Sequence, residues 1–133
     1  VRLERLLFRY GSLLEDLFAL MDENPELATP LTDAPRYLRA EIVYAARSAG
    51  VLHLADALMR RTRLDYETRD RGVSAAREVA EILAGELGWD EARREAEIEA
   101  YSAFIAARLE AEHTTSDAEA AALLENVREI PAR

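Results

Sequence analysis

The chain has 133 residues, half of them hydrophobic, and a formal net charge of −9. This length suits one domain with a modest core, and the apolar fraction is too high for a disordered chain. The acidic balance argues against nucleic acid and anionic lipid as direct partners, because both need a basic face. The lack of cysteine excludes disulfides and thiolate chemistry, and no apolar run approaches the ~18 residues of a membrane span.

Capping and stop signals divide the first half of the chain into helices and one loop. A short apolar helical run comes first, and a capping box from Ser12 to Glu15 then starts a helix that ends before Pro25. The next helix carries an apolar stripe at helical spacing and stops at Gly50. The elements expected here are a helical run over 2–9, a helix over 12–24, a proline-rich loop over 25–35, and helices over 36–49 and 54–62.

The second half of the chain predicts three further helices. Residues 65–72 are polar and turn-like, and the amphipathic helix after them stops at Gly88, with Trp89 folding back onto its last turn. Asp90 starts what we expect to be the longest helix. A capping box at Ser116 starts the last one. The expected helices cover 73–87, 90–112 and 116–131.

These elements predict an all-α chain, a single compact domain of about six amphipathic helices without a sheet. Residues 1–112 are expected to form the helical domain itself. Residues 113–133 hold a polar break and a terminal helix that we expect to be loosely docked. The abrupt start without methionine indicates a piece of a longer chain.

Motifs for chemistry are absent from the sequence. The five glycines are scattered, so no glycine-rich nucleotide turn forms, and no cluster of histidine, cysteine and carboxylate suits a metal. We therefore predict no catalytic, cofactor-binding or metal-binding residue in this chain. His53 and His113 are interpreted as residues at helix ends. A solvated helix face is the interpretation for the glutamates at 95, 97, 99, 110 and 112.

The stretch from Asp56 to Leu64 is the one candidate for ligand binding, because Arg60, Arg61 and Arg63 fall within four residues. Arg60 should pair with Asp56, four residues earlier on the same helix. Guanidinium groups hold phosphates and carboxylates by paired hydrogen bonds, so Arg61 and Arg63 offer a grip on an anionic ligand. The alternative is internal pairing with nearby acids, namely Glu41, Asp65, Glu67 or Asp70.

Glu41 is a structural candidate, because it lies at the edge of an apolar stripe and needs a partner there. Arg61 lies at the edge of the stripe on the next helix. The connection around residues 50–53 is short, so the two helices should pack roughly antiparallel. We predict a structural ion pair between Glu41 and Arg61.

Several stretches of the chain match the pattern of a known family. They are Arg9–Ser12, Tyr37–Ala46, Leu54–Leu64 and Glu86–Asp90, together with Tyr101. In order and spacing they resemble the C-terminal domain of FAD-dependent, respiratory glycerol-3-phosphate dehydrogenases, in a version that looks actinobacterial. The resemblance covers about residues 1–110 and is strongest from Asp56 to Leu64.

The resemblance implies a function that belongs to a larger parent protein. Such an enzyme oxidises sn-glycerol 3-phosphate to dihydroxyacetone phosphate, passing a hydride to FAD and then electrons to a quinone. It works at the cytoplasmic face of the membrane, often as a dimer. The preceding domains hold flavin and substrate, so no catalytic or FAD-binding residue of the family is carried onto this chain.

The expected partners are the FAD and substrate domains of the parent chain and a second copy in a homodimer. Quinone and the membrane surface would be met only through the parent. Two alternatives stay open. One is a self-standing helical module that binds another protein, and the other is a small-anion binder that uses Arg61 and Arg63.

Overall fold

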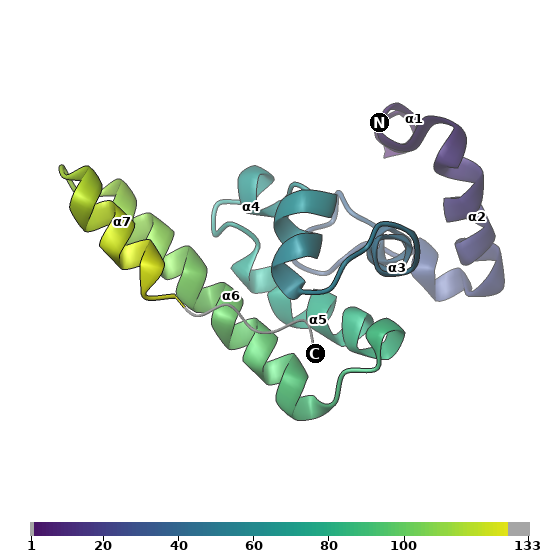
Figure 1. Cartoon of the computed structure of the whole chain (residues 1–133). Helices are drawn as coiled ribbons and strands as arrows, with labels where there is room; N and C mark the ends of the chain where they lie inside the picture. Colours follow the sequence, from purple (N-terminus) through teal and green to yellow (C-terminus); the bar gives the residue numbers. More distant parts are fainter. Residues whose placement is uncertain (1, 128–133) are drawn as a thin grey trace.

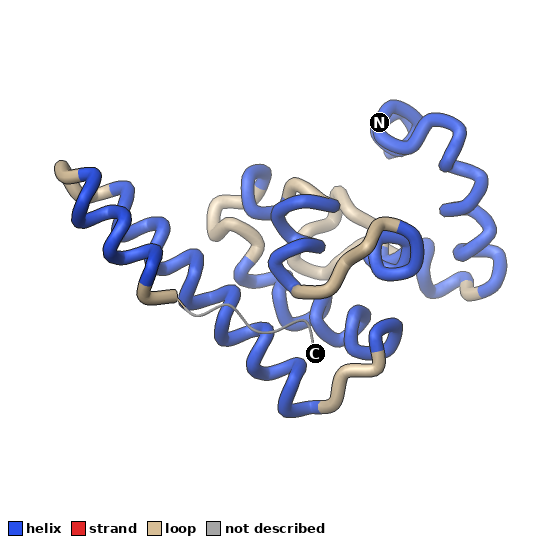
Figure 2. The backbone as a smooth tube through the Cα atoms, viewed as in Figure 1, coloured by secondary structure: helices blue, strands red, loops and turns tan. Residues whose placement is uncertain are grey.

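Helices make up almost all of the regular structure in the computed structural model, which describes residues 2–127, and Figure 2 shows no strand in that part. The predicted all-α class is therefore confirmed. The last helix, predicted to reach residue 131, ends already at Glu125, and residues 128–131 lie outside the described part. In chain order the elements are α1 (Arg2–Tyr10), η1 (Gly11–Leu13), α2 (Leu14–Glu23), η2 (Pro25–Ala28), α3 (Arg39–Ser48), η3 (Asp56–Arg61), α4 (Leu64–Glu67), α5 (Val73–Leu87), α6 (Glu91–Glu112) and α7 (Asp117–Glu125).

The helices are arranged as a central body with one projection at each end (Figure 1). Helices α3 and α5 and the turn η3 form the body, α1 and α2 lie at one end, and α6 and α7 extend as a hairpin at the other. The main core joins the body to α6 through side chains such as Leu58, Leu83 and Tyr101. A smaller core around Leu6, Leu17 and Leu38 joins α1 and α2 to α3. No helix in the described part is both long and apolar enough to cross a bilayer.

Local signals set the boundary between α5 and α6 as predicted. Gly88 adopts a left-handed conformation with φ +71°, which a residue without Cβ accepts without strain. The Trp89 amide donates to the Ala84 carbonyl at 3.1 Å, and the indole packs on the main core. The Asp90 carboxylate then accepts from the Arg93 amide at 2.7 Å and caps α6. The helix over 73–87 is confirmed to the residue.

The predicted capping box at Ser12 is wrong. The chain makes a 3-10 turn over Gly11–Leu13, and α2 begins at Leu14 without a side-chain cap. The Leu14 amide donates to the Gly11 carbonyl instead of to the serine hydroxyl. Leu13, the residue directly before α2, has helical backbone angles (φ −79°, ψ −2°), so no extended N-cap residue precedes this helix.

The third helix is shorter than predicted, because the residues before it are tied to the proline-rich loop. The Leu31 amide donates to the Tyr37 carbonyl at 2.9 Å, and the Arg39 amide donates to the Thr29 carbonyl at 3.0 Å. These bonds hold residue 38 extended, so α3 begins only at Arg39. Similarly, the polar stretch over 65–72 is a turn only in part, because its start belongs to the short helix α4.

The predicted α-helix over 54–62 is mostly a π-helix. The Thr62 amide donates to the carbonyl of Ala57, five residues earlier, at 2.8 Å. The buried Thr62 hydroxyl donates to the same carbonyl at 2.8 Å and lies 3.3 Å from that of Leu58. A short side chain that bonds back to these carbonyls stabilises the wider turn.

Candidate functional site

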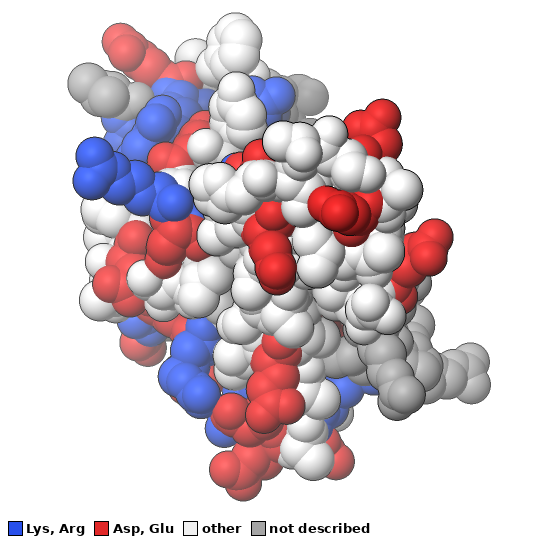
Figure 3. Space-filling model, turned by 90° about the vertical axis from the view of Figure 1, so that its left-hand side faces the viewer, with Lys and Arg blue, Asp and Glu red and all other residues white. Residues whose placement is uncertain are grey.

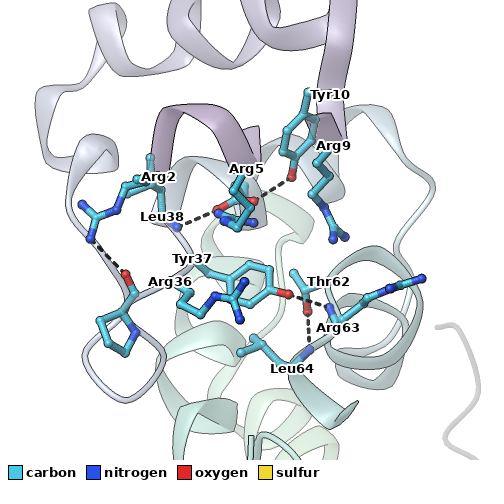
Figure 4. A network of polar contacts seen from close by, with 12 residues as sticks. Arg2, Arg5, Arg9, Tyr10, Arg36, Tyr37, Leu38, Thr62, Arg63 and Leu64 are labelled. Atoms are coloured by element: carbon cyan, nitrogen blue, oxygen red, sulfur yellow. Dashed lines mark hydrogen bonds and ion pairs between the residues drawn. The ribbon is translucent and has the colours of Figure 1, made fainter. Parts of the chain in front are cut away.

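A buried polar network with Glu41 at its centre joins α1 to the start of α3. Figure 4 labels three partners of this carboxylate, namely Arg5, Tyr10 and Leu38. Glu41 is 1% exposed, and its carboxylate accepts three hydrogen bonds. They come from the Arg5 guanidinium at 2.6 Å, the Leu38 amide at 2.8 Å and the Tyr10 hydroxyl at 3.1 Å. A buried carboxylate is stable only when its charge is balanced in this way.

The predicted partner of Glu41 is wrong, because Arg5 takes the place expected for Arg61. Helix α1 lies against α3 and delivers Arg5 from 36 residues away in sequence. Arg61 lies on the π-helix, and its side chain is exposed. A π-helix turns less per residue than an α-helix, so a face deduced from α-helical spacing does not hold there.

Tyr37 extends this network from α1 to the segment after η3. It is 1% exposed, and the Arg5 guanidinium lies 4.6 Å from the centre of its ring. Its hydroxyl accepts from the Arg63 amide at 3.1 Å and donates to the Glu67 carboxylate at 2.9 Å. Burial raises the pKa of the Tyr37 phenol, and burial with the charge of Glu41 raises that of Tyr10. Both hydroxyls therefore stay protonated donors.

The predicted pair of Arg60 and Asp56 is confirmed at 3.2 Å. Since the Arg60 side chain is 77% exposed, this pair contributes only about 0.3–0.5 kcal/mol. The other oxygen of Asp56 accepts from the amides of Leu52 and His53 at 3.1 and 3.0 Å. The main role of Asp56 is therefore to fix the start of the helical segment that contains η3.

Arg61 and Arg63 are both exposed, and within residues 2–127 neither guanidinium forms an ion pair. The Arg61 carbonyl accepts from Arg9, and the Arg63 amide donates to Tyr37, so both contacts use backbone. Internal pairing of the two arginines is therefore not seen, and anion binding by them stays a prediction. Nearby acids are engaged elsewhere: Asp65 with Arg108, Glu67 with Tyr37 and Asp70 with Ser74.

A second buried network surrounds Glu97, which the sequence analysis placed wrongly on a solvated face. Glu97 is 3% exposed, and it accepts from Arg93 Nε and from the Leu54 amide, each at 2.9 Å. His53 Nδ1 lies 2.9 Å from the same carboxylate. The signal was present: Glu97 lies four residues before the buried Tyr101 and four after Arg93, on one face of α6.

A cavity of about 590 Å³ opens between η3, α6 and α7, with His53, Asp56, Asp65, Glu97 and Tyr101 in its lining. The Glu97 and Asp56 carboxylates are held by the donors described above. The described residues contain no cluster of three or more histidine and carboxylate side chains that would hold a metal ion. Figure 3 shows the molecule from the side on which the α6–α7 hairpin ends, where acidic side chains are spread among uncharged ones and basic ones gather towards one edge. The polar side chains described above thus join segments that are distant in sequence.

Comparison with known proteins identifies the family of this chain. A family described as the C-terminal domain of alpha-glycerophosphate oxidase matches residues 1–94. Glycerol-3-phosphate dehydrogenase 2 of Mycobacterium bovis is 46% identical over 108 residues, 81% of this chain and 18% of the relative. Glycerol-3-phosphate dehydrogenase of Mycobacterium leprae is 44% identical with the same coverage.

More distant relatives include the mitochondrial glycerol-3-phosphate dehydrogenase SDP6 of Arabidopsis thaliana, 31% identical over 96 residues. The 96 matched residues are 72% of this chain and 15% of the Arabidopsis protein. The chain spans less than a fifth of the length of each relative named here. No solved structure matches the chain. The matches fall on the C-terminal part of the relatives. The resemblance found in the sequence is confirmed, and the chain belongs to the family of the C-terminal domain of alpha-glycerophosphate oxidase.

Proposed function

We propose that this chain is the accessory C-terminal domain of an enzyme that oxidises sn-glycerol 3-phosphate to dihydroxyacetone phosphate. The match over residues 1–94, with relatives of that name at 44–46% identity, carries the proposal. In the parent enzyme FAD accepts the hydride and a quinone accepts the electrons. The parent is peripheral at the cytoplasmic face of the membrane, and this domain meets quinone or lipid only through it.

The residues of this chain do not fit an FAD site. A dinucleotide pyrophosphate binds at a glycine-rich turn between a strand and a helix, and residues 2–127 contain no strand. The cavity beneath α7 is lined by the carboxylates of Asp56, Asp65 and Glu97, and the two arginines in its lining, Arg60 and Arg108, pair with the first two, so neither is free to hold a pyrophosphate. FAD is therefore assigned to the preceding domains of the parent.

The proposed role of this domain is structural. Glu41 and Glu97 are the two buried carboxylates of the described part, and each joins elements that are distant in sequence. Their donors come from α1 and from the segment before η3. Buried side chains that are satisfied by such bonds hold the segments they join in place. Such networks would allow this domain to stabilise the parent enzyme, its homodimer or its docking geometry.

An assay of the parent enzyme and of the 133-residue chain tests this proposal. The parent should reduce an artificial electron acceptor when glycerol 3-phosphate is added, and it should show a flavin absorbance spectrum after gel filtration. The 133-residue chain with added FAD should do neither. Turnover by the chain alone, or a parent that ignores glycerol 3-phosphate, would refute the proposal. A parent chain without a flavin domain would favour the self-standing interaction module.

A further inference from the structure

A surface helix usually turns its apolar side towards the core and its charged side towards water. Helix α1 shows the reverse arrangement for most of its residues. Three arginines reach from α1 to other segments of the molecule. Arg2 donates to the Pro35 carbonyl at 3.1 Å, Arg5 to Glu41 at 2.6 Å, and Arg9 to the Arg61 carbonyl. Leu6 is the one buried apolar side chain of this helix.

The outer side of α1 carries large exposed apolar side chains, with the exposed Glu4 among them. Phe8 is 96% exposed, Leu3 is 60% exposed and Leu7 is 58% exposed. Leu13, in the turn that follows, is 48% exposed. Figure 1 shows α1 at the end of the molecule opposite to the α6–α7 hairpin. A helix of a water-exposed surface points its apolar stripe at the core, so this arrangement is typical of a helix covered on both sides.

We propose that this outer face, formed by Leu3, Leu7, Phe8 and Leu13, is the surface on which the preceding part of the parent chain docks. The inference rests on the proposed function. In the relatives this domain accounts for 18% of the length, so most of the chain lies outside it. The face is on the first helix of the family match, and the matches fall on the C-terminal part of the relatives.

The size of the face favours a tethered partner over a second copy. Phe8 offers at most the ~150–250 Å² of an aromatic side chain, and the half-exposed leucines add less each. A stable interface between separate proteins needs about 800 Å² from each partner. Attachment in one polypeptide raises the effective concentration, so a smaller apolar contact is sufficient.

Hydroxyl-radical labelling of side chains tests the docking face directly. The 133-residue chain and the full-length parent enzyme are labelled under identical conditions, and modification of Phe8 is compared with that of Tyr66. Tyr66 is an aromatic side chain on α4 with 84% exposure and serves as the control. Phe8 should be labelled several-fold less in the parent, with Tyr66 unchanged. Equal labelling of Phe8 in both proteins would overturn the inference.

A pair of variants gives a second measurement. Phe8→Glu should leave the thermal midpoint of the 133-residue chain unchanged and lower that of the parent. Leu109→Glu, at an exposed leucine near the far end of α6, should change both midpoints equally. A 133-residue chain that sediments as a dimer and protects Phe8 would make the second copy the occupant and contradict our assignment. Failure of the parent to oxidise glycerol 3-phosphate would count against the proposed function alone, because labelling does not depend on activity.

Discussion

Replacement of Glu41 by alanine should be among the most destabilising single changes in this domain. The side chain is fully buried and accepts from Arg5, Tyr10 and Leu38 at distances between 2.6 and 3.1 Å. Without the carboxylate, the guanidinium of Arg5, whose side chain is only 17% exposed, would keep its charge but lose its carboxylate acceptor. The Leu38 amide at the start of α3 would also lose its acceptor.

The magnitude follows from these contacts. Removing one partner of a buried ion pair destabilises a protein by about 3–5 kcal/mol, because the other charge is left uncompensated. Arg5 retains some contact with water, so the lower part of that range applies, about 3 kcal/mol. Glu41→Gln preserves the shape and an acceptor oxygen but removes the charge, and a loss of about 1–2 kcal/mol is expected.

A double-mutant cycle measured by urea unfolding separates the pairing from the general effect of truncation. Glu41→Ala, Arg5→Ala and the double variant should give a coupling energy of about 1–3 kcal/mol. The matched control cycle uses Arg61→Ala in place of Arg5→Ala, because Arg61 is exposed and, within residues 2–127, its guanidinium does not contact Glu41. That cycle should give a coupling near zero.

Two results would refute this reasoning. A coupling between Glu41 and Arg5 that is indistinguishable from zero would mean that the buried pair contributes nothing specific. Strong coupling between Glu41 and Arg61 would restore the pairing expected from helical spacing and would place α1 elsewhere. Either conclusion requires that the slope of unfolding free energy against urea concentration is equal in all variants, because a changed slope would indicate a changed denatured state.

Three further changes have defined outcomes. Glu97→Gln should lower the free energy of unfolding in urea by about 1–3 kcal/mol, because Arg93 then lacks its carboxylate; an unchanged value would contradict the buried network. Burial raises the pKa of the Tyr10 and Tyr101 phenols in the folded state, so their contribution is complete below about pH 10 and is lost as the pH rises further. Tyr101→Phe should flatten this alkaline loss in urea melts, and an identical profile would disprove the link. Gly88→Ala should lower the thermal midpoint by the equivalent of about 1 kcal/mol, since φ there is +71°; an unchanged midpoint would argue against the left-handed stop.

The sequence was sufficient where a structural signal is local. The helix over 73–87, its stop at Gly88 and the cap at Asp90 depend on residues within one turn of each other, and all three appear as predicted. The pair of Arg60 with Asp56 is also local. Patterns of this kind are read without knowledge of the tertiary structure.

Tertiary placement decided the features that the sequence did not predict. The partner of Glu41 depends on where α1 packs, and Arg5 is 36 residues away from it. The π-helix at η3 depends on where the Thr62 amide and hydroxyl bond, and it changes the face on which Arg61 lies. The acidic neighbours of Glu97 favour a solvated helix face, but Glu97 lies on the same face of α6 as Tyr101 and is buried.

The claim that this domain supplies structure and not chemistry is tested most directly in the full-length parent enzyme carrying Glu41→Ala. Thermal unfolding and the rate of glycerol 3-phosphate oxidation per bound flavin are measured on the same preparation. We predict a lower thermal midpoint with the rate per flavin and KM unchanged. A rate per flavin that falls at least tenfold, about 1.4 kcal/mol in barrier height, while the thermal midpoint stays at the wild-type value would contradict the account.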